Sequence, residues 1–273
     1  MDAPATLLTF TNSQLNPETK IPGLNFSEAY GLGRSLVMYY AIPGRQRLWR
    51  KFYGEFVEEG DLCFDIGAHV GNRTATLAAV GARVVAIEPQ SHFQTILRLL
   101  YGRNAAVVLS DKAVGAKSGK GKLHVSPRTP TVSSLSADWV KKMGESPGFK
   151  GVSWDQEERV EITTLDALIA EHGPPKICKL DVEGYELEAL KGLSQAIEHI
   201  SFEYLPSAID IALACLDYLE SLGNYEFNIV EGEIPTFAFS RWSSASEMSE
   251  RLKAMSTKQR AGEIYGRLVR ADE

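Results

Sequence analysis

Hydrophobic and polar residues follow two different periods along this chain. Short, almost continuous apolar runs predict buried strands, whereas apolar positions three or four residues apart predict helices. The expected strands lie at 61–66, 83–88, 106–110, 176–181, 198–204 and 225–230. The expected helices lie at 72–80, 91–101, 164–172, 185–196 and 207–222. This alternation predicts an α/β fold with a mostly parallel sheet and helices on both of its faces.

The two ends of the chain depart from this alternation. Residues 1–58 are expected to form an N-terminal extension, whose second half has helical spacing interrupted at Pro43-Gly44. These helices would cap the core or form the face of a homodimer. The core domain is expected to span residues 59–273, and near its end the runs "YEFNIVEGE" and "AGEIYGRLVRA" predict a pair of antiparallel strands.

Residues 126–157 fit neither period. A long irregular segment inside a compact domain is usually a lid or a binding loop, so we expect a substrate-binding insertion here. Its aromatic residues Trp139, Phe149 and Trp154 would either form apolar walls for a substrate or anchor the segment to the core. Just before it, residues 111–122 combine lysines with glycines, which predicts an exposed hairpin.

Composition restricts the class of protein and its partners. The 273 residues carry a formal net charge of −6, which argues against a broad nucleic-acid-binding surface because such a surface needs clustered Lys and Arg. Cys63, Cys178 and Cys215 lack the C-x-x-C spacing of a structural zinc site or a disulfide framework. The chain shows neither a basic leader nor an uninterrupted apolar run of about 20 residues. We therefore expect a cytoplasmic protein with no membrane partner.

The run "DLCFDIGAHVGN" at residues 61–72 places an acid at the end of the first strand and two glycines in the turn that follows. In open α/β sheets, ligands bind beyond the carboxyl ends of the strands, where the strand order reverses. Gly67 and Gly71 would let a ligand approach the backbone closely. Glu88 ends the second strand, where a carboxylate can accept hydrogen bonds from two ribose hydroxyls. These features predict a nucleoside site.

The spacing of this motif indicates which nucleoside. Dinucleotide-binding proteins have G-x-G-x-x-G and leave the helix N-terminus clear for a pyrophosphate. Here the spacing is D-x-G-x-x-x-G, and the charge of Asp65 would repel a pyrophosphate but attract an ammonium or sulfonium group. S-adenosylmethionine carries both cations. The chain has no G-x-x-x-x-G-K-[ST] after any strand, so a P-loop is excluded.

A second acidic motif, "KLDVEGYELEAL", follows the strand expected at 176–181. Asp181 would end that strand beside the methyl donor, and Glu183 would open the next turn. We expect Asp181 to act as a general base, with Glu183 or Glu203 as the alternative, and Lys179 to orient a carboxylate from the same side of the strand. No metal-ligand motif is present, although a divalent cation held by Asp181, Glu183 and Glu203 stays a possibility.

In these motifs the sequence resembles the FkbM-type family of S-adenosylmethionine-dependent methyltransferases. The resemblance covers residues 33–269 and rests on "FDIGAHVGNRT", "VVAIEPQ", "TTLDALI", "KLDVEGYELEALKGL" and "SFEYLP". It implies a Rossmann-like, seven-stranded class I methyltransferase sheet and, most often, O-methylation of a hydroxyl on a small molecule, sugar or natural product. One departure is visible, because "AGEIY" stands where the family has S-G-D-[IV]-Y, but Glu263 keeps the charge.

The resemblance also implies a set of cofactor-binding residues near the first strands and the turns that follow them. This set is Asp65, Gly67, Ala68, His69, Gly71, Asn72, Glu88, Pro89, Asp111, Lys112, Ala113 and Asp181. The residues from the glycine turn would hold the methionine part, Glu88 the ribose, and Asp111 to Ala113 the adenine. His69, inside the turn, would have an indirect role.

Other functions remain open at this point. The acceptor could be a nitrogen, a carboxyl group or the ribose of RNA, although the acidic charge weighs against RNA. The chain could also be a nucleoside-binding module without catalysis, or a nicotinamide-dependent dehydrogenase, although the D-x-G-x-x-x-G spacing argues against the latter. The motifs leave open which small-molecule, glycan or natural-product acceptor the protein takes.

Overall fold

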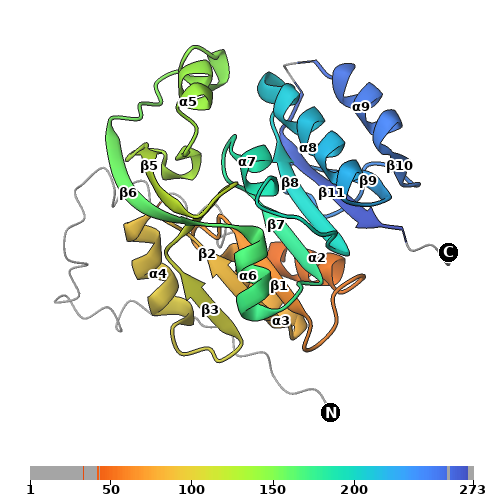
Figure 1. Ribbon diagram of the computed structural model, residues 1–273, viewed down its shortest axis with the longest axis horizontal. Coiled ribbons are helices and arrows are strands. Elements are labelled where there is room, and N and C mark those ends of the chain that lie inside the picture. Colours follow the sequence, from red (N-terminus) through yellow and green to blue (C-terminus); the bar gives the residue numbers. More distant parts are fainter. Residues whose placement is uncertain (1–32, 34–41, 43, 257–258, 270–273) are drawn as a thin grey trace.

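The computed structural model describes residues 33, 42, 44–256 and 259–269, and Figure 1 shows their arrangement. The main sheet has eight strands in the order β10-β9-β11-β8-β7-β1-β2-β3. These strands are β1 (Leu62–Ile66), β2 (Arg83–Ile87), β3 (Val107–Ser110), β7 (Ile177–Leu180), β8 (His199–Tyr204), β9 (Tyr225–Glu231), β10 (Ser243–Ser244) and β11 (Gly262–Leu268).

The pairing of these strands confirms the predicted fold class. Strands β3, β2, β1, β7 and β8 are parallel neighbours, and β11 runs antiparallel to both β8 and β9. The expected seven strands are all present, and the two-residue strand β10 extends the sheet beyond β9. The chain moves outward from β1 to β3 and later returns to β7, so the strand order reverses between β1 and β7. This is the position at which such sheets bind ligands.

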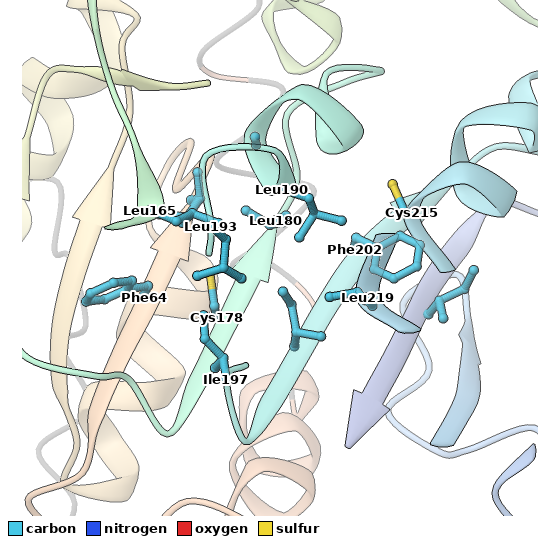
Figure 2. Packing of buried hydrophobic residues seen from close by; sticks show 14 of the residues in the cluster. Phe64, Leu165, Cys178, Leu180, Leu190, Leu193, Ile197, Phe202, Cys215 and Leu219 are labelled. Carbon is cyan, nitrogen blue, oxygen red and sulfur yellow. The ribbon is translucent and has the colours of Figure 1, made fainter. Parts of the chain in front are cut away.

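Helices cover both faces of the sheet (Figure 1). One face is covered by α6 (Leu165–His172), α7 (Glu186–Leu190), α8 (Ile209–Leu222) and α9 (Ala245–Lys253), and the other by α2 (Arg45–Tyr53), α3 (Asn72–Val80) and α4 (Ser91–Tyr101). The first face has a continuous apolar core, to which Phe64, Leu180 and Phe202 of the strands and Leu190 and Leu219 of the helices all belong (Figure 2). Helix α7 ends at Leu190, so the helix predicted over 185–196 is too long.

A second sheet lies beside the carboxyl ends of the main strands (Figure 1). It contains β4 (Ala113–Val114), β6 (Gln156–Thr163) and β5 (Gly119–Val125), in that order. The prediction of a hairpin over residues 111–122 is wrong, because β4 and β5 do not pair with each other but with opposite edges of β6. The pairing therefore depends on a strand that lies more than thirty residues later in the sequence.

The segment 126–157 is more regular than its sequence suggested. It contains η1 (Pro130–Val132), helix α5 (Ala137–Gly144) and η2 (Pro147–Phe149). Ser136 caps α5 by accepting a hydrogen bond from the Trp139 amide at 3.1 Å. Trp154 donates its indole N–H to the Val132 carbonyl at 2.7 Å, so this tryptophan joins the two ends of the segment to each other. Whether the segment also binds substrate stays a prediction.

Three remaining expectations concern the start of the chain, the cysteines and membranes. Helix α2 begins directly after Gly44, at the predicted interruption, whereas the expected helical residues before Pro43 lie outside the described part. The division into an extension over 1–58 and a core over 59–273 stays a prediction. All three cysteines are free and buried. Among the described residues, no helix has the length and apolar character needed to cross a bilayer.

Candidate active site

A cavity with about 660 Å³ of empty volume opens beyond the carboxyl ends of β1, β2 and β7. It lies at the reversal of strand order and extends toward the second sheet. Its lining is Ile66, Gly67, His69, Ile87, Glu88, Pro89, Gln90, Ala113, Val114, Leu123, Thr131, Ser133, Leu135, Asp181, Val182, Glu183 and Tyr185. Seven residues of the predicted site are among them.

The glycine turn forms the floor of this cavity through its backbone. Gly67 has φ of +78°, and a Cβ atom at this position would lie 1.8 Å from the backbone oxygen of Asp181. Gly71 also has positive φ, and a Cβ atom there would meet the Tyr101 ring at 2.5 Å. A side chain at residue 67 would therefore separate the two strand ends that carry the site.

Glu88 follows β2 and is held by the backbone on both sides. Its Oε2 accepts a hydrogen bond from the His69 amide at 2.9 Å, and its Oε1 accepts one from the Gln90 amide at 2.9 Å. Glu88 is only 3% exposed, and this burial raises its pKa to about 7, although the two amides oppose the shift. The carboxylate is thus fixed in position at the cavity wall, where it can accept further hydrogen bonds from a diol.

A row of charges runs below the cavity through neighbouring strands. Asp65 and Lys179 are register partners on β1 and β7, and the Lys179 ammonium donates to Asp181 Oδ2 at 2.9 Å. Asp65 is fully buried and accepts a hydrogen bond from Thr74 Oγ1 at 2.5 Å. Burial raises the pKa of Asp65, while the charge of Lys179 opposes this. Burial alone would lower the pKa of Lys179, but the carboxylates of Asp181 and Asp65 hold it above its usual range.

Three carboxylates gather at the other side of the cavity. Asp181, Glu183 and Glu203 each offer an oxygen within 4.8 Å of the other two. Burial and the charge of Glu203 raise the pKa of Glu183, and burial and the charge of Asp181 raise the pKa of Glu203. Glu183 and Glu203 therefore favour their protonated forms more than exposed carboxyl groups do.

The backbone of the second acidic motif brings these carboxylates together. Glu183 has φ of +53°, an unusual conformation for a residue with a side chain, and Gly184 follows with φ of +84°. Glu186 stabilises this turn because its Oε1 accepts hydrogen bonds from the amides of Val182 and Gly184 at 3.1 and 3.2 Å. The turn therefore directs Glu183 toward the cavity at a cost in backbone strain.

The predicted site residues fall into two groups. Gly67, His69, Glu88, Pro89, Ala113, Asp181 and Glu183 line the cavity. The others, namely Asp65, Ala68, Gly71, Asn72, Asp111, Lys112 and Lys179, do not line it. Asp65, Ala68 and Lys179 are buried, and the exposed Asp111 side chain instead lies 3.6 Å from Arg98. Burial lowers the pKa of His69 to about 3, so its imidazole is neutral at physiological pH.

Several residues at the site had no signal in the sequence. Gln90 links Glu88 to the insertion, since its side chain donates to the Pro130 carbonyl at 3.2 Å and accepts from Ser133 at 3.0 Å. Thr74 holds Asp65, and Glu186 supports the turn after β7. Polar residues such as these are common on helices and loops, so the sequence does not mark them as part of a site. Only the folded structure shows that they contact the site residues.

The carboxylates of Asp181, Glu183 and Glu203 could also hold a divalent cation, because hard cations bind clustered oxygen ligands. Three carboxylates supply only part of the six to eight ligands that calcium takes, or the six of magnesium. The same cluster can act as a base without a cation.

Comparisons with known proteins identify relatives of this chain. A profile of the methyltransferase FkbM domain matches residues 65–255. Hexuronic acid methyltransferase AglP of Haloferax volcanii is 28% identical over 162 residues, which is 59% of this chain and 61% of that protein. The match therefore spans less than two thirds of the length of this relative.

Solved structures with a similar arrangement are more distant in sequence. A TehB-like SAM-dependent methyltransferase from Corynebacterium glutamicum has a TM-score of 0.44 and 10% identity, over 89% of this chain and 98% of that chain. An rRNA methylase from Streptococcus thermophilus has a TM-score of 0.43 and 12% identity, over 81% of this chain and 94% of that chain.

Proposed function

Because the chain belongs to the methyltransferase FkbM family, we propose that it uses S-adenosylmethionine to methylate a hydroxyl group on a sugar, small molecule or natural product. The observation that carries this proposal is the group of three carboxylates beside the cavity. A hydroxyl must lose its proton when it is methylated, and a carboxylate within reach can take that proton.

The cavity fits the cofactor in chemical terms. Glu88 suits the ribose diol, and the close approach of Gly67 to Asp181 leaves backbone rather than side chains at the floor. The Asp65 carboxylate lies just below this floor, and one of its oxygens has no hydrogen-bond partner among the described residues. We propose that Asp65 and Asp181 favour a cationic methionine part by their charge. When bound, S-adenosylmethionine supplies a methyl group that leaves sulfur without its bonding electron pair.

We assign the role of base to Glu183. Asp181 is already paired with Lys179, whereas the Glu183 side chain accepts no hydrogen bond from the described residues and lines the cavity. Its raised pKa also makes it a stronger base than an ordinary carboxylate once it is ionised. As the acceptor O–H bond breaks, Glu183 takes the proton and the oxygen electron pair forms the bond to the methyl carbon. Lys179 keeps Asp181 in place and is a positioning residue.

The sugar part of the proposal is supported by one relative. AglP is named as a hexuronic acid methyltransferase, and it shares 28% of residues over the matched region. Clustered carboxylates at the candidate site suit hydroxyl groups, which donate hydrogen bonds to them. The RNA alternative is less well supported, because the protein carries a net charge of −6.

Two experiments test the proposal in sequence. The first measures thermal unfolding with S-adenosylhomocysteine and, separately, with NADH. A ligand at about 100 times its Kd stabilises the folded state by about 2.7 kcal/mol, so an increase in Tm is expected only with S-adenosylhomocysteine. An increase with NADH alone would contradict the cofactor assignment.

The second experiment incubates the protein with S-adenosylmethionine and a panel of hydroxylated acceptors, and identifies the methylated atom by mass spectrometry and NMR. Methyl transfer to oxygen is expected, and Glu183→Gln should lower kcat by about 10²–10⁴-fold while cofactor binding is retained. The matched control is Glu188→Gln on α7, the helix that follows the Glu183 turn, where Glu188 pairs with Lys191 at the surface. Methylation only of nitrogen or of carboxyl groups would contradict the proposal.

A further inference from the structure

A second, smaller cavity of about 220 Å³ lies next to the candidate site. Trp139 of α5, Gly184 and Glu203 are part of its lining, and Leu205 and Ile211 make it partly apolar. Glu203 also belongs to the carboxylate cluster, whose other members line the larger cavity. The cluster therefore lies where the two cavities approach each other.

Trp139 is held firmly in the wall of this second cavity. A Cβ atom on Gly184 would lie 2.0 Å from Cδ1 of its indole, so the ring packs directly on the glycine. Phe149 and Trp154 contact the ring edge-to-face, with centroid distances of 5.6 and 6.0 Å. Trp139 is only 2% exposed, yet its indole N–H has no hydrogen-bond partner among the described residues. A buried donor of this kind is costly unless a ligand atom accepts from it.

The charged side chains that line the two cavities are all acidic. The smaller cavity is lined by Glu203 and Glu186, and the larger one by Glu88, Asp181 and Glu183. Among the described lining residues of either cavity there is no Lys or Arg. The nearest buried cation is Lys179, which already donates to Asp181. An anionic acceptor would therefore meet repulsion that no side chain in the lining offsets.

A hydroxyl group suits this arrangement better than either charged alternative. It can accept a hydrogen bond from the Trp139 indole and donate its own proton to a carboxylate. An ammonium group only donates and leaves the indole N–H without a partner. A carboxylate group accepts from the indole but is repelled by the acidic cluster.

On the basis of the hydroxyl methylation proposed above, we infer that the acceptor is a neutral polyhydroxylated ring, such as a sugar without a carboxyl group. One of its hydroxyls contacts Trp139 Nε1 and Glu203, and the site selects against hexuronic acids. The preferred substrate would thus differ in charge from the hexuronic acid named for AglP.

The test compares acceptors that differ only in charge. Methyl pyranosides of the gluco, galacto and manno series are each used with C6 as a hydroxymethyl group, an aminomethyl group or a carboxylate, and kcat/KM is measured by S-adenosylhomocysteine release. The neutral members should exceed their uronate counterparts by at least about tenfold at low salt, with the amino members between them. Raising the salt concentration should narrow the difference, because screening weakens the repulsion.

Two tryptophan variants test the contact with the hydroxyl. Trp139→Phe keeps an aromatic ring but removes the indole N–H, and should raise KM for the neutral acceptor by about 3- to 10-fold with little change in kcat. Trp154→Phe is the matched control, because its indole N–H is satisfied by Val132 and the residue lines neither cavity. It should lower Tm without changing KM. Glu203→Gln should reduce the preference for neutral over uronate acceptors.

The outcomes separate this inference from the proposed function. Equal or better transfer to uronate hydroxyls would overturn the selectivity and leave hydroxyl methylation intact. Transfer to the amino group alone would overturn hydroxyl methylation itself. If cofactor binding is retained but no saccharide of any charge is methylated, the assignment of a sugar-like acceptor is overturned.

Discussion

The two faces of the central sheet are built from the same strands but differ in chemistry. Toward α6, α7 and α8, the strands present Phe64, Cys178 and Leu180 to a large cluster of buried hydrophobic residues (Figure 2). Toward α2 and α3, the next residues along the same strands are Asp65 and Lys179. Because successive side chains of a strand point to opposite faces, a single residue step separates the apolar core from a buried charge.

The polar face continues across the whole sheet. Register pairs connect Lys179 with Ser201, and Glu203 with Glu263, so these side chains share a face. Arg73 of α3 donates to Glu263 at 3.1 Å, and its guanidinium lies 3.4 Å from the centre of the Trp49 ring. Burying such charges contributes little net stability, because desolvation offsets the attraction between them. The comparison indicates that hydrophobic clusters pack on both faces, whereas the buried charges that organise the site lie on the face covered by α2 and α3.

The largest effect is expected where one partner of the buried charge row is removed. Lys179→Met keeps the length of the side chain but leaves Asp65 and Asp181 without their cation, and should lower the free energy of unfolding by about 3–5 kcal/mol. Its matched control is the next residue, Leu180→Met, which faces the apolar core and should cost less than about 1.5 kcal/mol. Urea unfolding at neutral pH measures both. If both variants lost the same free energy of unfolding, the buried charges of one face would be no more costly to disturb than the apolar residues of the other.

The second prediction concerns ligand affinity rather than stability. Asp65→Asn should weaken binding of S-adenosylhomocysteine by about 10- to 100-fold, or about 1.4–2.8 kcal/mol, because the amide lacks the charge that attracts the ammonium group. Phe64→Leu, one residue earlier on the apolar face, should lower stability and leave the affinity unchanged. Isothermal titration calorimetry measures the affinity of each variant for S-adenosylhomocysteine. An unchanged affinity in Asp65→Asn would assign Asp65 to structure alone.

The third prediction follows from the raised pKa of Glu88, which is about 7. Its preference for the protonated form stabilises the folded apoprotein below pH 4.5, and this contribution is lost as the pH rises through about 7. Ribose hydroxyls donate to the ionised form, so ligand affinity should change in the opposite direction and increase about tenfold from pH 6 to pH 8. Glu88→Gln should remove this pH dependence. If wild-type affinity did not vary with pH, Glu88 would not be the ribose ligand.

The smallest effect is expected at a buried polar residue whose side chain makes no hydrogen bond with the described residues. Ser201 is fully buried on the polar face, and its hydroxyl has no hydrogen-bond partner among the described residues. Ser201→Ala removes an unsatisfied group and should change the free energy of unfolding by less than about 1 kcal/mol, toward higher stability. A loss of several kcal/mol, measured by urea unfolding, would show that this hydroxyl is part of the charge network.

The regular elements of the main sheet could be predicted from the sequence because their signals are local. The helix over Ser91–Tyr101 has the predicted bounds, and β1 and β2 differ from prediction by one residue at an end. Buried parallel strands are apolar over their whole length, so "RVVAI" identifies β2 without knowledge of its neighbours. The second sheet was missed because β6 is half exposed and charged, and its pairing with β4 and β5 is not local.

The sequence alone determined which residue types end the strands, and with them the family and the class of cofactor expected. Asp65, Gly67 and Glu88 are recognisable because their spacing belongs to one continuous strand–turn–helix unit. The sequence suggested that Asp181, Glu183 and Glu203 could act together, but only the tertiary structure decided that their oxygens lie within 4.8 Å of one another and that Trp139 lies against Gly184. These contacts join β7, β8 and α5, which are separate in sequence. Their geometry is set by packing between elements, which no local pattern of residues encodes.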